Sequence, residues 1–186
     1  MTYTVRTFTL RSPSSHLGKK EKKAETVDKF PAIDFKCLPF RELSLDQLYD
    51  LMALRQAVFV VEQDCPYLDA DGKDQVAHHV LAYKEREELV AYTRLLPPGI
   101  SYDDYASIGR VITRNSERRT GLGRKLMTES IRRARQLFPE QPIKISAQCY
   151  LLKFYESFGF RSVGESYLED GIPHIGMVLK QTVDGE

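Results

Sequence analysis

The sequence contains few cysteines and no long apolar run, and each shortage excludes a class of protein. Its three cysteines, Cys37, Cys65 and Cys149, are odd in number and form no Cys-x-x-Cys pair. This pattern argues against a disulfide framework and against a thiolate zinc site. The longest uninterrupted apolar run, 57–61, is far shorter than the roughly 20 residues that a membrane-spanning helix needs. We therefore expect a cytoplasmic protein with no metal and no membrane partner.

Net charge is also nearly absent, because 27 basic residues face 26 acidic ones and the formal charge is +1. No overall field attracts nucleic acid, so any positive binding site has to be local. The 186 residues, 42% of them hydrophobic, are enough for one ordinary core. We expect a single domain over 33–186.

The first part of the chain differs from the rest, since 12–29 is rich in Ser, Lys and Glu and has few large apolar side chains. Such a segment cannot offset the entropy lost on ordering, so 1–32 is interpreted as a flexible N-terminal extension. Its first twenty residues have four basic side chains and no acid, so an organelle transit peptide is the alternative.

Hydrophobic periodicity predicts an α+β fold with a mixed sheet flanked by helices. Ser44 and Gln47 form a capping box that starts a helix running toward Val58, with Leu45 and Arg55 on its apolar face. A second, longer helix follows Gly121, and a short one covers 151–158. The expected strands are 34–40, 78–83, 89–96, 107–113, 143–147, 161–167 and 174–180.

The most informative segment runs from Arg118 to Arg124, because a basic turn containing Gly121 and Gly123 separates a predicted strand from a predicted helix. A helix start leaves main-chain N–H groups unpaired, so the amides of 119–124 can bind a diphosphate. Neither the dinucleotide fingerprint Gly-x-Gly-x-x-Gly nor a P-loop is present. The alternative is a glycine-softened helix start with solvated arginines.

Arg-x-x-Gly-x-Gly after a strand resembles the acyl-CoA-binding turn of the GNAT acyltransferases. The chain is similar to the ElaA-like branch of that superfamily over about 36–180, through four further segments: 54–67, 108–112, 147–148 with 154–160, and 169–177. The resemblance implies a twisted mixed sheet whose fourth and fifth strands splay, with the pantetheine arm of acetyl-CoA lying between them. It assigns the following cofactor-binding residues: Val111, Ile112, Thr113, Arg118, Arg119, Thr120, Gly121, Leu122, Gly123, Arg124 and Gln148.

Acyl transfer from a thioester to an amine needs a proton donor for the thiolate and a base for the amine. Tyr155 resembles the family's proton donor, although full transfer from a phenol to a thiolate is uphill by about 2 kcal/mol for ordinary pKa values. Without the resemblance, Tyr155 is equally read as a core aromatic beside Phe154 and Phe158. His174 titrates in the right range for a base, with a structural histidine as the alternative. The oxyanion would be met by a backbone N–H of the strand 111–113, as the resemblance implies.

Two charged residues of the first helix region are candidates for the acceptor side. Glu62 is placed to recognise an amine or relay its proton, and Arg55 to pair with Glu62 or with a substrate carboxylate. A buried structural ion pair is the alternative for both.

The acids Asp69, Asp71 and Asp74 do not fit a calcium loop, because Gly72 follows the second acid and the final Glu of that pattern is missing. We expect a solvated acidic loop bordering the acceptor pocket. His78 and His79 point to opposite faces of a strand and are expected to be packing or surface residues.

Together these features predict an acetyl-CoA-dependent N-acetyltransferase. The acceptor would be a small-molecule amine or an exposed protein amine, attacking directly in a ternary complex, and a homodimer is possible. Two alternatives remain open: an enzyme using a longer acyl donor, related in chemistry to homoserine-lactone synthases, and a noncatalytic CoA-sensing or partner-binding module.

Overall fold

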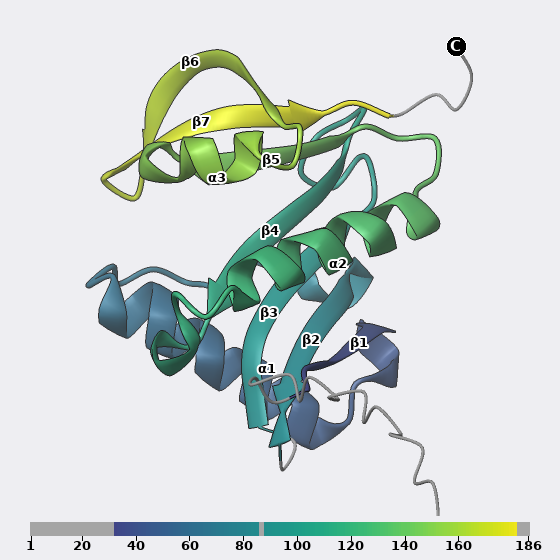
Figure 1. Ribbon diagram of the computed structural model, residues 1–186, viewed down its shortest axis with the longest axis vertical. Coiled ribbons are helices and arrows are strands. Elements are labelled where there is room, and N and C mark those ends of the chain that lie inside the picture. The colour runs from purple at the N-terminus through teal and green to yellow at the C-terminus, as the bar shows by residue number, and fades with distance from the viewer. Residues whose placement is uncertain (1–31, 86–87, 182–186) are drawn as a thin grey trace, which may run out of the picture. The chain divides into compact units, whose positions relative to one another are not determined.

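Residues 32–85 and 88–181 are described by a computed structural model. They form one mixed sheet of seven strands in the order β1-β2-β3-β4-β5-β7-β6 (Figure 1). The strands are β1 (Asp34–Pro39), β2 (His78–Lys84), β3 (Glu88–Leu96), β4 (Ala106–Thr113), β5 (Ile143–Gln148), β6 (Arg161–Glu169) and β7 (Ile172–Leu179). The predicted mixed sheet flanked by helices is confirmed, and all seven strands lie where alternation placed them.

The one parallel pair in the sheet is β4 with β5, and it is short. These strands are in register only at Ala106↔Ile143 and Ser107↔Lys144, whereas every other neighbouring pair is antiparallel and longer. The helix α2 (Leu122–Leu137) makes the crossover between them. Beyond Ser107 the edge of β4 that faces β5 has no ladder partner in the described ranges. The two strands therefore diverge, as the resemblance implies.

Helix α1 (Leu45–Arg55) begins with the predicted capping box: Gln47 N–H donates to Ser44 Oγ, and Ser44 N–H to Gln47 Oε1. It continues as a π-helix, η2 (Gln56–Glu62), past the predicted end at Val58. The expectation that Leu45 lies on the buried face is wrong, because Leu45 is 84% exposed. Only the C-terminal half of the helix rests on the sheet, through Leu51, Leu54 and Arg55.

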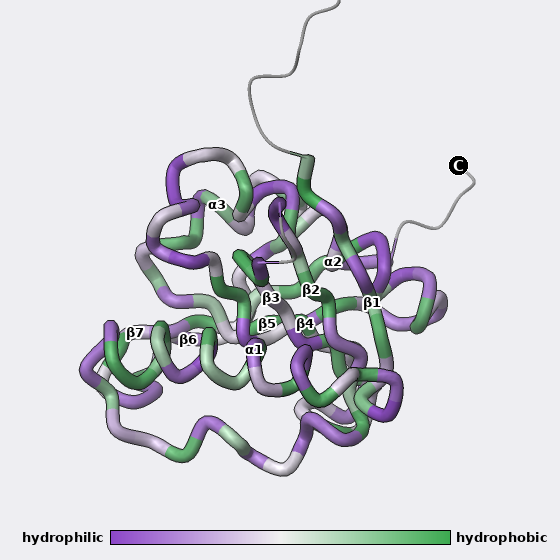
Figure 2. The backbone as a smooth tube through the Cα atoms, turned by 90° about the horizontal axis from the view of Figure 1, so that it is seen from below, coloured by the Kyte–Doolittle hydropathy of each residue, from purple (hydrophilic) through white to green (hydrophobic). Residues whose placement is uncertain are grey.

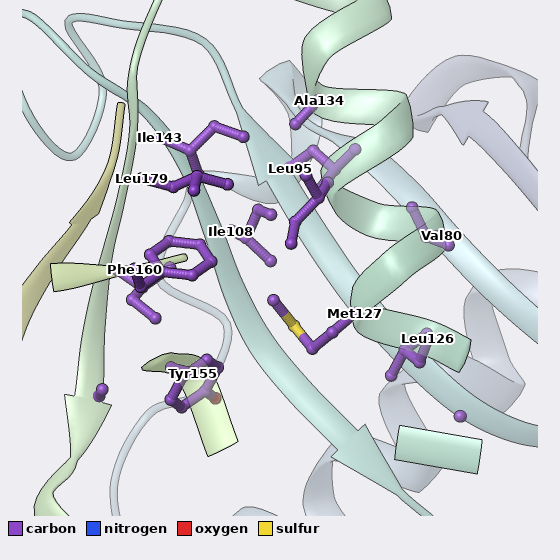
Figure 3. Packing of buried hydrophobic residues seen from close by; sticks show 14 of the residues in the cluster. Val80, Leu95, Ile108, Leu126, Met127, Ala134, Ile143, Tyr155, Phe160 and Leu179 are labelled. Carbon is purple, nitrogen blue, oxygen red and sulfur yellow. The ribbon is translucent and has the colours of Figure 1, made fainter. Parts of the chain in front are cut away.

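The core has two layers, one on each face of the sheet. On one face α2 and the short α3 (Leu152–Glu156) pack on the strands, and Figure 3 shows Met127, Tyr155 and Phe160 converging there. On the other face α1 and η2 cover Leu81 and Tyr92. Hydrophilic segments lie mainly on the outer loops (Figure 2). Four 3₁₀ turns lie wholly within the described residues: η1 (Phe40–Glu42), η3 (Asp74–Val76), η5 (Asn115–Glu117) and η6 (Cys149–Leu151).

The predicted N-terminal extension and transit peptide fall almost entirely outside the described residues, and both stay predictions. Within the described ranges, no helix combines the length and the apolar character that a membrane crossing requires.

Candidate functional site

A cleft of about 850 Å³ opens where β4 and β5 diverge. Its walls come from both strands, from η2 and the segment after it, and from the β6–β7 hairpin. The cleft brings together eight of the predicted site residues: Glu62, Val111, Ile112, Thr113, Arg118, Gln148, Tyr155 and His174. Arg55 and the turn 119–124 are not part of its lining.

A bulge in β4 forms one wall of the cleft. Tyr92 pairs with Ile112 and Arg94 with Gly109, so two residues of β4 face one residue of β3. Arg110 lies in this bulge with φ +54, a conformation that costs free energy for any residue with a Cβ. The Arg110 side chain is held by Asp69, because its Nε donates to Asp69 Oδ1 at 2.6 Å. The bulge is therefore fixed by a contact from a distant part of the chain.

The predicted anion-binding turn is exposed at the N-terminal end of α2. Gly121 caps the helix with φ +87, and Arg119 has φ +64. The expectation of free amides throughout 119–124 is wrong at two positions. Leu122 N–H donates to Thr120 Oγ1 at 3.4 Å and Arg124 N–H to Gly121 O at 3.1 Å, because the first helical turn closes tightly. The other four amides donate no hydrogen bond within the described residues.

Arg118 and Glu62 meet across the mouth of the cleft. The Arg118 guanidinium donates to both carboxylate oxygens of Glu62, with Nη2–Oε2 at 2.9 Å. Both side chains are about one-third exposed, at 37% and 36%. The expected pairing of Glu62 with Arg55 is therefore wrong, and the Glu62 carboxylate faces a residue of the anion-binding turn.

Tyr155 lies between the core and the cleft. It is 6% exposed, and its ring packs edge-on against Phe154 and Phe160 (Figure 3). It is also part of the cleft lining, so the core and catalytic interpretations of this residue are compatible. Burial, with a smaller contribution from Tyr150, raises the pKa of Tyr155 to about 12. The phenol of Tyr155 therefore keeps its proton at neutral pH.

His174 occupies the facing wall, on β7 directly opposite Gln148 of β5. It is 9% exposed, and its Nδ1 lies 2.8 Å from the carbonyl oxygen of Ile172. Because a carbonyl only accepts, this contact assigns the proton to Nδ1 and leaves a lone pair on Nε2. Nε2 has no hydrogen-bond partner within the described ranges. A neutral His174 ring therefore presents Nε2 to the cleft as its proton acceptor.

Arg55 is completely buried and cannot contact a substrate carboxylate, which corrects that expectation. Its three donor groups are used inside the protein: Nε with Asp69 at 2.6 Å, Nη1 with Asp74 at 2.7 Å and Nη2 with the Asp69 carbonyl at 2.8 Å. The guanidinium also lies 5.9 Å from the ring centre of Tyr92. The alternative of a buried structural ion pair is the one the structure has, with partners other than Glu62.

The acidic segment is not a solvated loop, because Asp69 and Asp74 are only 4% and 7% exposed. Burial by itself raises the pKa of Asp69, but the hydrogen bond and charge of Arg55, together with Arg110, outweigh it and lower that pKa. The bonds to two arginines outside the predicted set complete the network: Arg94 with Asp71 and Asp74, and Arg110 with Asp69 and Asp71. Sequence spacing gave no sign that these strand residues would meet the segment.

The two adjacent histidines of β2 have packing roles, as expected. His79 is fully buried between Tyr92 Oη at 2.8 Å and the Asp74 carbonyl at 3.1 Å. His78 lies on the opposite face, edge-on to Phe138.

Three further cleft residues, Ser146, Tyr167 and Glu169, were absent from the predicted site. They come from β5 and β6 and are joined by hydrogen bonds of 2.6 and 2.7 Å at the Ser146 hydroxyl. Ser146 and Tyr167 lie in the predicted strands 143–147 and 161–167 and Glu169 just beyond the second, but strand positions do not reveal which strands become neighbours. The three cysteines are free thiols, and no group of His, Cys, Asp or Glu among the described residues is arranged to hold a metal ion.

Comparison with known proteins supports the geometric picture. The model of the acetyltransferase (GNAT) domain matches residues 57–181. Protein ElaA of Escherichia coli is 47% identical over 149 residues, which cover 78% of this chain and 95% of that protein. The crystal structure of E. coli ElaA has a TM-score of 0.75 at 44% identity and covers 80% of this chain and 100% of its own.

Two other solved structures extend the comparison. An acyl-CoA N-acyltransferase from Pseudomonas aeruginosa has a TM-score of 0.74 at 43% identity, covering 79% of this chain and 99% of that chain. A CoA-dependent acyl-homoserine lactone synthase has a TM-score of 0.65 at 17% identity, covering 80% of this chain and 84% of that chain. The latter shows a shared fold alone.

Proposed function

Because this chain belongs to the GNAT acetyltransferase family, as an ElaA-like member, we propose that it transfers an acetyl group from acetyl-CoA to an amine. The observation that carries this proposal is the divergence of β4 and β5 after two register pairs. It opens a cleft whose walls present the unpaired edge of β4, the Tyr155 phenol and the His174 imidazole.

The donor would lie along this opening. The backbone of Val111, Ile112 and Thr113 would pair with the pantetheine arm, and Gln148 would contact it from β5. The exposed turn 119–124 would hold the diphosphate through its remaining free amides and the positive end of α2. Gly123 favours this approach. A Cβ built there would meet no atom closer than Thr113 Cγ2 at 3.9 Å, so packing within the protein does not require a glycine, and its missing side chain would leave room for the ligand.

The chemistry follows from the protonation states of two side chains. A protonated acceptor amine gives a proton to His174 Nε2, and the neutral nitrogen forms a bond to the thioester carbonyl carbon. The carbon–sulfur bond then breaks, Tyr155 donates its phenolic proton to the departing sulfur, and the newly bonded nitrogen releases its second proton to solvent. The products are an amide and free CoA, and the proton held by His174 restores the phenol through solvent. A general acid of this kind contributes about 10²- to 10⁴-fold.

The developing oxyanion requires a donor near the bulge of β4. We assign this role to a backbone N–H of 111–113, next to the strained Arg110. The acceptor enters from the side of Glu62 and the β6–β7 hairpin, and direct attack in a ternary complex needs no covalent enzyme intermediate. The cytoplasmic location and a homodimer remain predictions of the sequence.

The test is a thiol-release assay on the full chain with acetyl-CoA and a panel of primary amines, alongside calorimetry with CoA. We expect CoA binding and amine-dependent thiol release. Binding without release for any amine would favour a noncatalytic CoA-binding module, and a preference for longer acyl-CoA would favour the alternative donor. Absence of any CoA affinity would refute the proposal.

A further inference from the structure

A carboxylate in the cleft accepts a hydrogen bond from a serine hydroxyl, and a tyrosine hydroxyl orients that serine. Ser146 Oγ lies 2.6 Å from Tyr167 Oη and 2.7 Å from Glu169 Oε2. A serine hydroxyl has one proton and an ionised carboxylate only accepts, so Ser146 donates to Glu169 and accepts from Tyr167. All three side chains line the cleft. The second oxygen of Glu169 has no hydrogen-bond partner within 32–85 and 88–181.

Strand register relates this carboxylate to His174. Ser146 is two residues from Gln148 on β5, and Gln148 is the register partner of His174. The backbone of Ser146, which holds the carboxylate, is therefore offset by about 7 Å along β5 from the level of His174, whereas the backbone of Glu169 pairs with Ile172, two residues to the other side of His174. The Tyr167 ring covers the interval, stacked on the His174 ring with 6.4 Å between centroids, while β6 arches over β7 (Figure 1).

His174 supplies a second polar group in the same cleft. The residue is nine-tenths buried and lines the cleft, and its Nε2 has no hydrogen-bond partner in the described residues because Nδ1 is the nitrogen bonded to the Ile172 carbonyl. Nε2 is not a fully buried atom, so it is open to the cleft, where a ligand or water can meet it. The cleft thus offers a proton acceptor and a carboxylate held by Ser146, two residues along β5 from the register partner of His174.

The charge balance of the cleft selects the kind of ligand. Each arginine of the lining is already neutralised: Arg94 by Asp71 and Asp74, Arg110 by Asp69 and Asp71, and Arg118 by Glu62. Glu169 and Asp170 form no ion pair in the described part of the chain. The lining contains one lysine, Lys73, which is hydrogen-bonded to Ser101. Uncompensated negative charge therefore exceeds positive charge on the acceptor side.

We propose that Glu169, fixed by Ser146 and Tyr167, binds the non-reacting ammonium of a cationic acceptor, and that the acceptor is a short alkyl diamine. An extended four-carbon diamine separates its nitrogens by about 6 Å. This length is close to the two-residue offset along β5 between Ser146, which holds Glu169, and Gln148, which pairs with His174. A carboxylate next to the reacting nitrogen would keep it protonated, so this displaced position suits the second ammonium. The inference rests on the proposed acetyl transfer and names its substrate class.

The experiment compares two acceptors of equal length in the thiol-release assay of the full chain. The probe is 1,4-diaminobutane, and the matched control is 4-aminobutanoate, which has a carboxylate in place of the second ammonium. We expect kcat/KM to favour the diamine by at least about tenfold, because like charges at Glu169 repel the control. Glu169→Gln should bring the two within about threefold by raising the diamine KM, with kcat nearly unchanged. Asp170→Asn, which removes a neighbouring charge that nothing orients, should retain the preference.

Calorimetry with CoA checks each variant for a folded donor site. If Glu169→Gln binds CoA more weakly than the natural chain, Ser146→Ala gives the second readout, since it keeps the charge but releases its direction and should reduce the preference. Equal use of the two amines by the natural chain, or an unchanged preference in Glu169→Gln, would overturn the inference. The inference would also be overturned if the chain bound CoA but neither bound nor acetylated the diamine. That result would leave donor recognition intact. Loss of CoA binding in the natural chain would overturn the proposed function and this inference with it.

Discussion

Replacement of Arg55 by methionine should strongly destabilise the fold, because it breaks a buried ionic network at its centre. Arg55 donates to Asp69 and Asp74 at 2.6 and 2.7 Å, and those side chains are only 3% and 10% exposed. Breaking a buried pair by removing one partner costs about 3–5 kcal/mol. Asp69 keeps its ion pair with Arg110, and Asp74 keeps its ion pair with Arg94. We therefore expect the free energy of unfolding to fall by about 3 kcal/mol, the lower end of that range. Proteins are commonly stable by about 5–15 kcal/mol, so this is a large fraction.

The measurement is equilibrium unfolding in urea at pH 7, with the midpoint and slope fitted for each variant. Arg133→Met is the matched control, because it removes an arginine whose partner, Glu129, lies on the same helix and is also paired with Arg132, and its midpoint should change little. Adding Asp69→Asn to Arg55→Met should recover part of the loss, since it removes a carboxylate left short of cations. A loss below about 1 kcal/mol for Arg55→Met would refute the reasoning.

Four further results are expected. Tyr155→Phe should lower kcat by about 10²- to 10⁴-fold with CoA affinity unchanged, and the natural enzyme should not lose rate near pH 10, because burial raises the Tyr155 pKa to about 12; equal turnover of Tyr155→Phe would exclude this proton donor. Gly123→Ala should keep the melting temperature but weaken CoA binding measured by calorimetry, and unchanged affinity would show that the ligand does not approach there. Glu62→Gln should tighten CoA binding several-fold by freeing Arg118 for the diphosphate, whereas weaker binding would mean that the ion pair itself shapes the site. Stability should begin to fall below about pH 6.5, because burial lowers the pKa values of His78 and His79 in the folded state while the unfolded chain takes up those protons. It should fall further below about pH 4, because the pKa of Asp69 is lowered in the folded state and its contribution is lost as that carboxylate takes up a proton; constant stability from pH 7 to pH 3 in a urea titration would contradict this.

Much of the fold was legible in local patterns. The capping box at Ser44 and the left-handed Gly121 are short-range features, and each depends on a few neighbouring residues. Two apolar runs separated by the charged stretch 84–88 located the hairpin of β2 and β3, and both strands are buried on both faces. The prediction that Leu45 is buried failed because its burial depends on a long-range feature, the place where the helix axis crosses the sheet.

The candidate site was predicted unevenly for the same reason. Tyr155, His174 and the turn at Gly121 were named because each belongs to a contiguous motif that resembles a family. The partners of Arg55 were predicted wrongly, because Asp69 lies in an irregular segment and Asp74 at the start of the short turn η3 that ends it. Nothing in the local sequence distinguishes a solvated aspartate from one that meets a buried arginine.

The sequence by itself determined the elements, the two-sided core and the basic turn, because these depend on periodicity and on backbone conformations set by nearby residues. Only the tertiary structure decided that Glu62 pairs with Arg118, that the acidic segment closes over three arginines, and that Ser146 orients Glu169. Those contacts join positions far apart in the chain, and their partners follow from how strands are ordered and how far β4 and β5 diverge. Strand order and divergence arise from packing of the whole sheet, which no single segment encodes.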